Sequence, residues 1–534
     1  MLAPVLATLA LTVPASAAAG PGDPDRGFGG DGRIALPAAG AFVPRAVAVD
    51  GSDRIVVGGY SCAPDATGDG TCLTSGDGSF RIARLTPDGG LDPEFGENGF
   101  VTTPVGDGRS QALDLIVLRD GRVLAGGVAR SDGRDVFALA RYSAGGALDP
   151  GFGDGGIALA PTGSAFASLS DITLGPGGTV VGAGQAVDAL GVPRMAVARF
   201  TAQGALDGDF GTGGVTLGGA GEYGYGLGLD VAPDGAALVA GLAGDSPDAG
   251  SFRFGELRVT RAGAPARSFG SNGSAQQRVG SSSSFATAVG AVGSGWLTAG
   301  AAIAADGRQA MAALRLGADG RPEGSYGRRG SRVLALGDGA IANDLVAERD
   351  GHALLVGQVA RADGGYDFAV AALRGDGTSD RSFGDRGSAF TSWPDYPIAR
   401  ATAGARQRSG DLVTVGLGCV GGVGVHCDGG TARGLIARLQ GPDGTPPQIR
   451  VRPLRGLRLR VTVSEPARIA AALAPRRGGG LRWFAKPRRL VEAATLRVPP
   501  RGRSARGRRS RFVIRAVDQA GNGTRRRFTI RVRP

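Results

Sequence analysis

Short runs of apolar residues alternate with Gly- and Asp-rich turns along most of the chain. Residues 99–142 contain four such runs, "GFVTTP", "ALDLIVL", "RVLAGGV" and "VFALARY", with the turns "RDG" and "RSDGRD" between the later ones. Apolar runs of this length, separated by Asp-Gly turns, predict antiparallel β-hairpins. Because no stretch of the chain shows a sustained helical period, the pattern predicts an all-β protein.

One turn returns along the chain: "LDPEFGENGF" at 91–100 is followed by "LDPGFGDGGI" at 148–157 and "LDGDFGTGGV" at 206–215. Its aromatic-Gly pair occurs seven times. The first and second pairs are 67 residues apart, and each later pair follows the one before it after 57–59 residues. Such a period indicates a solenoid, a propeller or an array. Four strands in about 57 residues is the content of a propeller blade, so we expect a seven-bladed β-propeller of four-stranded antiparallel blades over residues 18–445. The aromatic residues are Phe28, Phe95, Phe152, Phe210, Phe269, Tyr326 and Phe383.

Most of these turns also contain a candidate ion pair. An acid stands three residues before the aromatic residue in six turns, and the seventh has Ala266. In most repeats an Arg stands eight residues before the acid position, on a strand whose faces should be buried. A buried Arg needs a partner, so we expect it to bind the acid through two parallel hydrogen bonds, while the aromatic residue fills the gap between blades. The acids are Asp25, Asp92, Asp149, Asp207, Glu323 and Asp380, and the arginines are Arg84, Arg141, Arg199, Arg258, Arg315 and Arg438.

Arg438 has no such turn after it in the sequence. Asp25, at the other end of the predicted propeller, has no repeat before it that could supply an Arg. A closed ring would therefore bring Arg438 near Asp25, although Asp443 is a local alternative. The recurrence of the acid in most repeats favours a structural role over binding of calcium or a polar ligand.

The D-x-x-FG-x-x-G turn and the A-R-aromatic strand before it resemble the bacterial delta-60 repeats. The resemblance covers about residues 23–445 and implies a β-propeller, although the segments 255–270 and 324–330 depart from the pattern.

The N-terminus and the cysteines predict an exported protein. The apolar run at 2–14 and the "ASA" at 15–17 have the pattern of a signal peptide, so we expect cleavage after residue 17 and a secreted or envelope-associated protein. That run is too short to span a membrane, and no other long apolar stretch occurs. The four cysteines predict two local disulfides, with unpaired thiols as the alternative. The expected pairs are Cys62–Cys72 and Cys419–Cys427.

Residues 446–534 differ from the rest in composition. They have a net charge of +22, almost all from Arg, whereas the remainder of the chain has a net charge of −10. Strand-like runs and the motif "AVDQAGN" at 516–522 resemble bacterial Ig-like and fibronectin-like modules, which implies a small β-sandwich. Such a charge attracts polyanions, so an anionic cell-wall polymer or polysaccharide is an expected partner. The alternative is that these arginines only form a solvated surface.

Catalytic motifs are absent from the sequence. The only histidines are His352 and His426, so a Ser–His–Asp triad or a multi-His metal site is not expected, nor is a cofactor. We expect a monomeric, exported, non-enzymatic binding or scaffold protein, for which a protein is a further expected partner. The alternative is a propeller-type carbohydrate-active hydrolase or lyase that uses carboxylates at the channel mouth. Non-repeated Asp, Glu, Arg and Tyr clustered in the channel would favour the enzyme, and repeated small residues would favour the binding protein.

Overall fold

The described part of the chain is almost entirely β-strand. The computed structural model describes residues 20–37, 41–62, 78–219, 221–246, 250, 252–348, 351–421, 431–441, 449–454, 458–473, 482–485, 491–497, 509–518 and 523–531. Within them, the helical structure is one 3-10 turn at Pro176–Gly178. The all-β prediction is therefore confirmed, and no described helix is long and apolar enough to cross a membrane.

Five four-stranded antiparallel sheets follow one another along the described chain. In each sheet three longer strands are followed by a fourth strand of four residues. The sheets are β2–β5 (Ala41–Val49, Ile55–Cys62, Ser79–Leu85, Phe100–Thr103), β6–β9 (Ser110–Val117, Val123–Ser131, Arg134–Tyr142, Ile157–Ala160), β10–β13 (Ala167–Leu174, Val180–Val187, Pro193–Phe200, Val215–Gly218), β14–β17 (Tyr223–Val231, Ala237–Gly244, Arg253–Val259, Ser274–Gln277) and β18–β21 (Ser284–Val292, Gly295–Ile303, Gln309–Leu316, Ser331–Leu334).

A sixth sheet has eight strands and brings the two ends of this region together. It contains β22–β25 (Gly339–Ala347, Ala353–Ala360, Tyr366–Leu373, Ser388–Thr391), β26–β28 (Ile398–Arg406, Leu412–Val420, Thr431–Leu439) and β1 (Arg33–Ala35). The strands β24 and β26 are joined by a single parallel bridge, between Tyr366 and Ile398. Strand β1 pairs antiparallel with β28, with Arg33 opposite Ala437.

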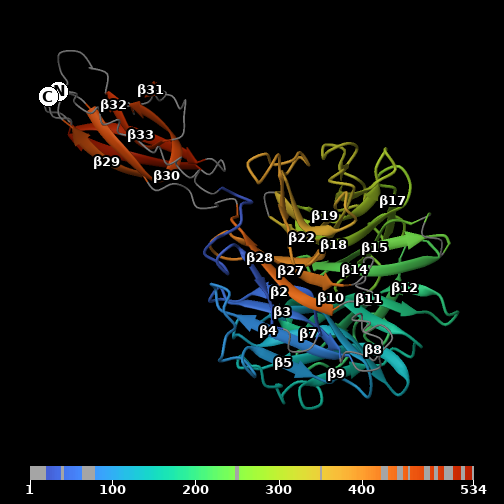
Figure 1. Ribbon diagram of the computed structural model, residues 1–534. Coiled ribbons are helices and arrows are strands. Elements are labelled where there is room, and N and C mark those ends of the chain that lie inside the picture. Colours follow the sequence, from blue (N-terminus) through green and yellow to red (C-terminus); the bar gives the residue numbers. More distant parts are fainter. Residues whose placement is uncertain are drawn as a thin grey trace, which may run out of the picture.

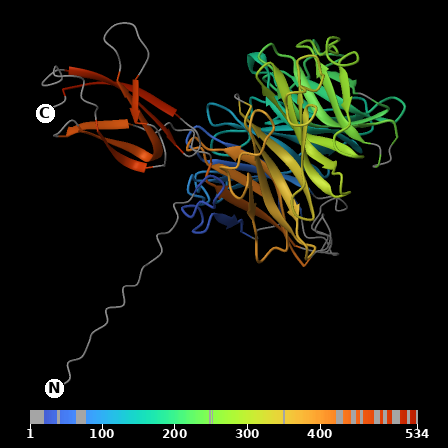
Figure 2. The ribbon, with the colours of Figure 1, turned by 90° about the horizontal axis from the view of Figure 1, so that it is seen from above.

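The sheets close into a ring around a channel. The first strand of each four-stranded unit contacts the first strand of the next, and β26 contacts β2. The hydroxyl of Thr402 in β26 donates a hydrogen bond to the carbonyl of Pro44 in β2 at 3.0 Å. Figures 1 and 2 both show the blue beginning of this region beside its orange end. The arrangement is that of a propeller rather than an open superhelix.

The cores lie between neighbouring sheets. One cluster joins Phe80 and Phe95 of the first sheet to Leu115, Val123 and Tyr142 of the second. The structure corrects the strand grouping expected from the sequence, because Phe100–Thr103 pairs with β4 of the preceding sheet and not with β6–β8. The aromatic-Gly turn therefore connects the third and fourth strands of one sheet. The chain passes to the next sheet only after the fourth strand.

The C-terminal strands form a separate sheet of six strands, joined by antiparallel pairing. The 16-residue strand β30 pairs with β29 and β32 through its first half and with β31 and β33 through its second half. The predicted β-sandwich stays a prediction. The strands are β29 (Ile449–Leu454), β30 (Arg458–Leu473), β31 (Arg482–Ala485), β32 (Val491–Arg497), β33 (Arg509–Asp518) and β34 (Gly523–Arg531).

Candidate ligand site in the central channel

The repeated Arg and Asp residues meet at the aromatic-Gly turns. Arg84 Nε donates to Asp92 Oδ2 at 2.8 Å, and both side chains are almost fully buried. Equivalent contacts follow in four other turns: Arg141–Asp149 and Arg199–Asp207 at 2.8 Å, Arg438–Asp25 at 2.7 Å and Arg315–Glu323 at 3.3 Å.

The second oxygen of these turn aspartates has a different partner. Asp149 Oδ1 accepts a hydrogen bond from the backbone N–H of Gly151 at 3.0 Å, while Oδ2 takes the Arg141 guanidinium. The predicted pair of parallel hydrogen bonds is therefore wrong, because one carboxylate oxygen is used to stabilise the turn. Asp380, which has no Arg at the expected position, instead contacts Arg374 at 3.0 Å.

The same arginines and aromatic residues connect consecutive sheets. The guanidinium of Arg141 lies 4.5 Å from the ring centroid of Phe152, and its NH1 donates to the carbonyl of Ala202 in the next sheet at 2.7 Å. Phe152 is fully buried against Gly204 of that sheet, where a Cβ atom would lie 2.8 Å from the ring. The repeated turn residues thus hold neighbouring sheets together, and all seven aromatic residues are at most 2% exposed.

The channel is lined by the first strand of every four-stranded unit, and each of these strands has a β-bulge. The bulge brings the strand close to its neighbour, so that a Cβ atom at Gly127 would lie only 1.9 Å from the carbonyl oxygen of Gln111. This close approach explains the glycine in the middle of each second strand. The residues at the bulges are Arg45, Leu113, Ser170, Leu227, Thr287, Asn343 and Thr402.

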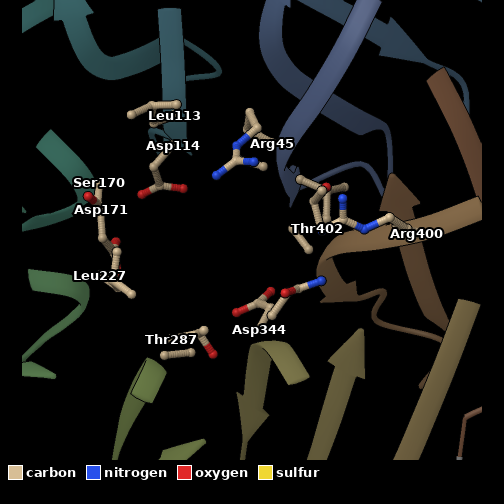
Figure 3. A pocket seen from close by; sticks show the side chains of 15 residues that line it. Arg45, Leu113, Asp114, Ser170, Asp171, Leu227, Thr287, Asp344, Arg400 and Thr402 are labelled. Carbon is tan, nitrogen blue, oxygen red and sulfur yellow. The ribbon is translucent and has the colours of Figure 1, made fainter. Parts of the chain in front are cut away.

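A cavity of about 300 Å³ lies within the channel between these bulges (Figure 3). The side chains that line it differ from one channel strand to the next, although these strands occupy equivalent positions in their sheets. Carboxyl groups come from Asp114, Asp171 and Asp344, and guanidinium groups come from Arg45 and Arg400. The cavity is therefore chemically asymmetric, in contrast to the repeated turns outside it.

Each carboxyl group in the cavity binds the backbone of the next channel strand. Asp114 Oδ2 accepts from the N–H of Ile172 at 2.9 Å, and Asp171 Oδ2 accepts from the N–H of Leu229 at 2.6 Å. Asp344 Oδ2 makes the same bond to Gly404 at 2.8 Å. These acids therefore help to fix the ring of strands, and each acid also faces the cavity.

Burial shifts the ionisation of the three acids. Loss of hydration raises the pKa of Asp114 to about 6 and raises the pKa of Asp171 well above its usual value. The negative charge of Asp114 raises the pKa of Asp171 further, and the two carboxyl groups are hydrogen-bonded to each other. Burial also raises the pKa of Asp344. Burial and the charge of Asp114 therefore both favour the protonated form of Asp171.

The guanidinium groups lie on the adjoining strands β2 and β26. Arg45 forms no hydrogen bond or ion pair with the part of the chain that the structure describes, and Figure 3 shows its guanidinium directed into the cavity towards Asp114. Arg400 Nε donates to Gln358 Oε1 at 2.8 Å. Burial lowers the pKa of Arg400, and the charge of Arg45 lowers it further. Groups of opposite charge therefore face one another across the cavity.

The described residues contain no group of three or more His, Cys, Asp or Glu side chains that could hold a metal ion. The predicted signal peptide, residues 1–17, lies outside the described residues, as do Cys72, Cys427 and His426. The two disulfides therefore remain predictions. Cys419 itself is buried in β27.

The channel acids and arginines were not among the residues singled out from the sequence. Asp114 lies in "ALDLIVL" and Asp344 in "NDLVAERD", where an acid interrupts a run that otherwise predicts a buried strand. An unexplained acid inside such a strand is the signal that could have found them.

Three segments of the chain, residues 66–95, 118–152 and 176–210, match the family described as "Domain of unknown function (DUF5122) beta-propeller". This match agrees with the closed ring of four-stranded sheets. The protein is a β-propeller. A comparison of the propeller with curated protein sequences finds no match.

Solved structures give distant matches to the propeller. Sqt1 from Chaetomium thermophilum has a TM-score of 0.34 at 14% identity, over 92% of this chain and 97% of that one. The gluconolactonase XC5397 from Xanthomonas campestris has a TM-score of 0.29 at 12% identity, over 76% and 98%. Likenesses this low assign no function to the propeller.

Proposed function

We propose that the protein is an exported, non-enzymatic binding protein whose channel cavity takes up a small polar molecule. The observation that carries this proposal is the cavity in which Arg45 faces Asp114 and Asp171 without an ion pair. Charged groups in a confined space need hydrogen-bond partners, and convergent polar groups in a concave site are typical of ligand binding. A bound molecule would supply those partners.

The same proposal includes the finer architecture. The eight-stranded sheet consists of two four-stranded units connected by one bridge, which supports seven blades built from delta-60-like repeats over residues 18–445. Residues 1–17 would direct export, and the disulfides Cys62–Cys72 and Cys419–Cys427 would form in the oxidising compartment. Residues 446–534 would form the Ig-like sandwich.

The basic C-terminal module would hold the protein at anionic polymers of the envelope. Its net charge is +22, and the strand register places Arg452 opposite Arg460, which is exposed. To test this role, the full chain and a chain ending at residue 445 are compared for retention on purified anionic cell-wall polymer. We expect retention of the full chain only, with loss at high salt. Equal or salt-insensitive retention of both chains would contradict the role.

The channel proposal is tested by thermal melting of the full chain against a broad set of small polar molecules. A ligand that binds only the folded protein raises the melting temperature. We expect at least one chemical class to do so, and the effect to disappear in the variant Arg45→Met/Asp114→Asn. Arg321→Met is the matched control, because the Arg321 side chain is 86% exposed, outside the cavity. The proposal fails if no class raises the melting temperature, or if the double variant responds like the wild type.

A hydrolase is the second candidate, and the Asp114–Asp171 pair is the observation that favours it. Two carboxyl groups whose pKa values differ can act as acid and base. Their direct hydrogen bond counts against glycoside hydrolysis, because the carboxyl groups of glycosidases are about 5 Å or more apart. Turnover of a panel of aryl glycosides, lost in Asp171→Asn and retained in Arg321→Met, would establish the enzyme over the binding protein.

A further inference from the structure

Two guanidinium groups share one side of the channel cavity, where the ring of strands closes. Arg45 is at the bulge of β2, and Arg400 is on β26, which contacts β2. Both side chains line the cavity, and the pKa of Arg400 is lowered by burial and further by the charge of Arg45. Two neighbouring guanidinium groups repel one another unless an anion lies between them. This side of the cavity therefore favours an oxyanion.

The wall next to Arg45, formed by β6 and β10, offers hydrogen bonds to neutral polar groups. Burial and the charge of Asp114 favour the protonated form of Asp171, which can donate a hydrogen bond as well as accept one. The Ser170 hydroxyl also lines this side, and no described residue is hydrogen-bonded to it. Hydroxyl groups of a ligand can form hydrogen bonds with the carboxyl groups of Asp114 and Asp171 and with the hydroxyl of Ser170.

The size and charge of the cavity further restrict the chemical class of the ligand. A volume of about 300 Å³ is at the lower end of small-molecule sites and suits a molecule of monosaccharide size. A dianion such as a phosphate ester would be repelled by the ionised form of Asp114 across the cavity. A carboxylate has one charge and matches the planar guanidinium fork.

We infer that the channel ligand is a small hydroxylated carboxylic acid of about monosaccharide size, with its carboxylate between Arg45 and Arg400 and its hydroxyl groups on Asp114 and Asp171. This inference rests on the proposed binding function. It assigns Arg45 as the residue that selects an acid over the corresponding neutral molecule.

Isothermal titration calorimetry of the full chain tests this inference. The probes are glucuronate, glucose with the same ring but no acid, glucosamine with a cation, acetate without hydroxyl groups, and inorganic phosphate. We expect glucuronate to bind at least tenfold more tightly than each other probe. Arg45→Met and Arg400→Met should each weaken glucuronate binding at least tenfold, Arg45→Lys should have a smaller effect because the charge remains, and Arg321→Met should change it less than twofold.

Other outcomes overturn the inference in distinguishable ways. Equal binding of glucose and glucuronate, or unchanged binding in a folded Arg45→Met variant, rejects the acid and leaves the channel proposal in place. Tighter binding of phosphate or acetate rejects the hydroxylated carboxylate. If none of the five probes binds, the inference is rejected, and the broad melting screen decides separately whether the channel binds another class.

Discussion

Arg438 and Asp25 are 413 residues apart in the sequence, yet Arg438 NH2 lies 2.7 Å from Asp25 Oδ2. The guanidinium also lies 4.6 Å from the ring centroid of Phe28 and donates to the carbonyl of Pro87 in the following sheet. This ion pair is the one that the repeat register predicts for a closed ring. The local alternative, Asp443, lies outside the described residues.

We expect Arg438→Met to destabilise the propeller by about 3 kcal/mol, because it leaves a mostly buried carboxylate without its partner. The Asp25 and Arg438 side chains are only 20% and 12% exposed. Asp25→Asn should have a similar effect, and the double variant should lose less than the sum of the two. Urea denaturation of the full chain measures these changes. A strictly additive double variant, or an equal loss in the exposed control Arg321→Met, would contradict the structural role of the pair.

A second prediction concerns the glycine that packs on each aromatic residue. Gly146 and Gly163 both have positive φ angles, +93° and +78°. Substitution of either residue by Ala therefore strains the backbone and lowers the free energy of unfolding. A Cβ at Gly146 would lie 2.8 Å from Val101 Cγ2 and 3.0 Å from the nitrogen of Gly96, whereas nothing lies within 4 Å at Gly163. We expect Gly146→Ala to cost about 2 kcal/mol more than Gly163→Ala in urea denaturation. Equal losses would show that the sheets do not depend on this contact.

Glu256 leads to a third prediction. It is completely buried in β16, neither carboxylate oxygen has a hydrogen-bond partner among the described residues, and burial raises its pKa to about 8. The folded protein then keeps a proton that the unfolded chain loses near pH 4.5. Stability should therefore fall as the pH rises from about 4.5 to about 8, by an amount on the order of 5 kcal/mol.

The change Glu256→Leu should remove this dependence, because equivalent positions in other sheets, such as Leu139, are apolar and buried. The measurement is urea denaturation of both proteins at pH 5 and pH 8. A wild-type stability that does not change over this range relative to Glu256→Leu would mean that Glu256 has a partner in solution.

The fourth prediction is a pH dependence of ligand binding. Asp114 lines the cavity together with Asp171, Asp344, Arg45 and Arg400, and its pKa is about 6. As the pH rises from 5 to 7, Asp114 becomes charged and repels a carboxylate ligand, so the affinity should fall about tenfold. Titration calorimetry with glucuronate at both pH values measures the change. The variant Asp114→Asn should bind equally at both, and a wild-type affinity that rises with pH would contradict the assigned charges.

The sequence predicted the strands, the ring and the turn pairs, because these depend on local turns and on the register of a repeat. Arg141, Asp149 and Phe152 occur at fixed spacing and meet in the structure as that spacing requires. The channel residues could not be found in the same way. A one-residue bulge decides which side of a strand faces the channel, and the bulge itself leaves no mark in the sequence. The acid that interrupts the apolar run at Asp114 was the one signal, and it does not show that the side chain faces a cavity.

The pairing of β1 with β28 requires that β1 remain without its partner strand until β28 has been synthesised. Residues 33–35 are synthesised first, but their partners at 435–437 emerge about four hundred residues later. Contacts between segments that are far apart in the sequence are slow to form, and strands that are still unpaired are prone to aggregate. The step that closes the propeller therefore joins its first strand to its last, and any interruption of synthesis before residue 439 leaves the ring open.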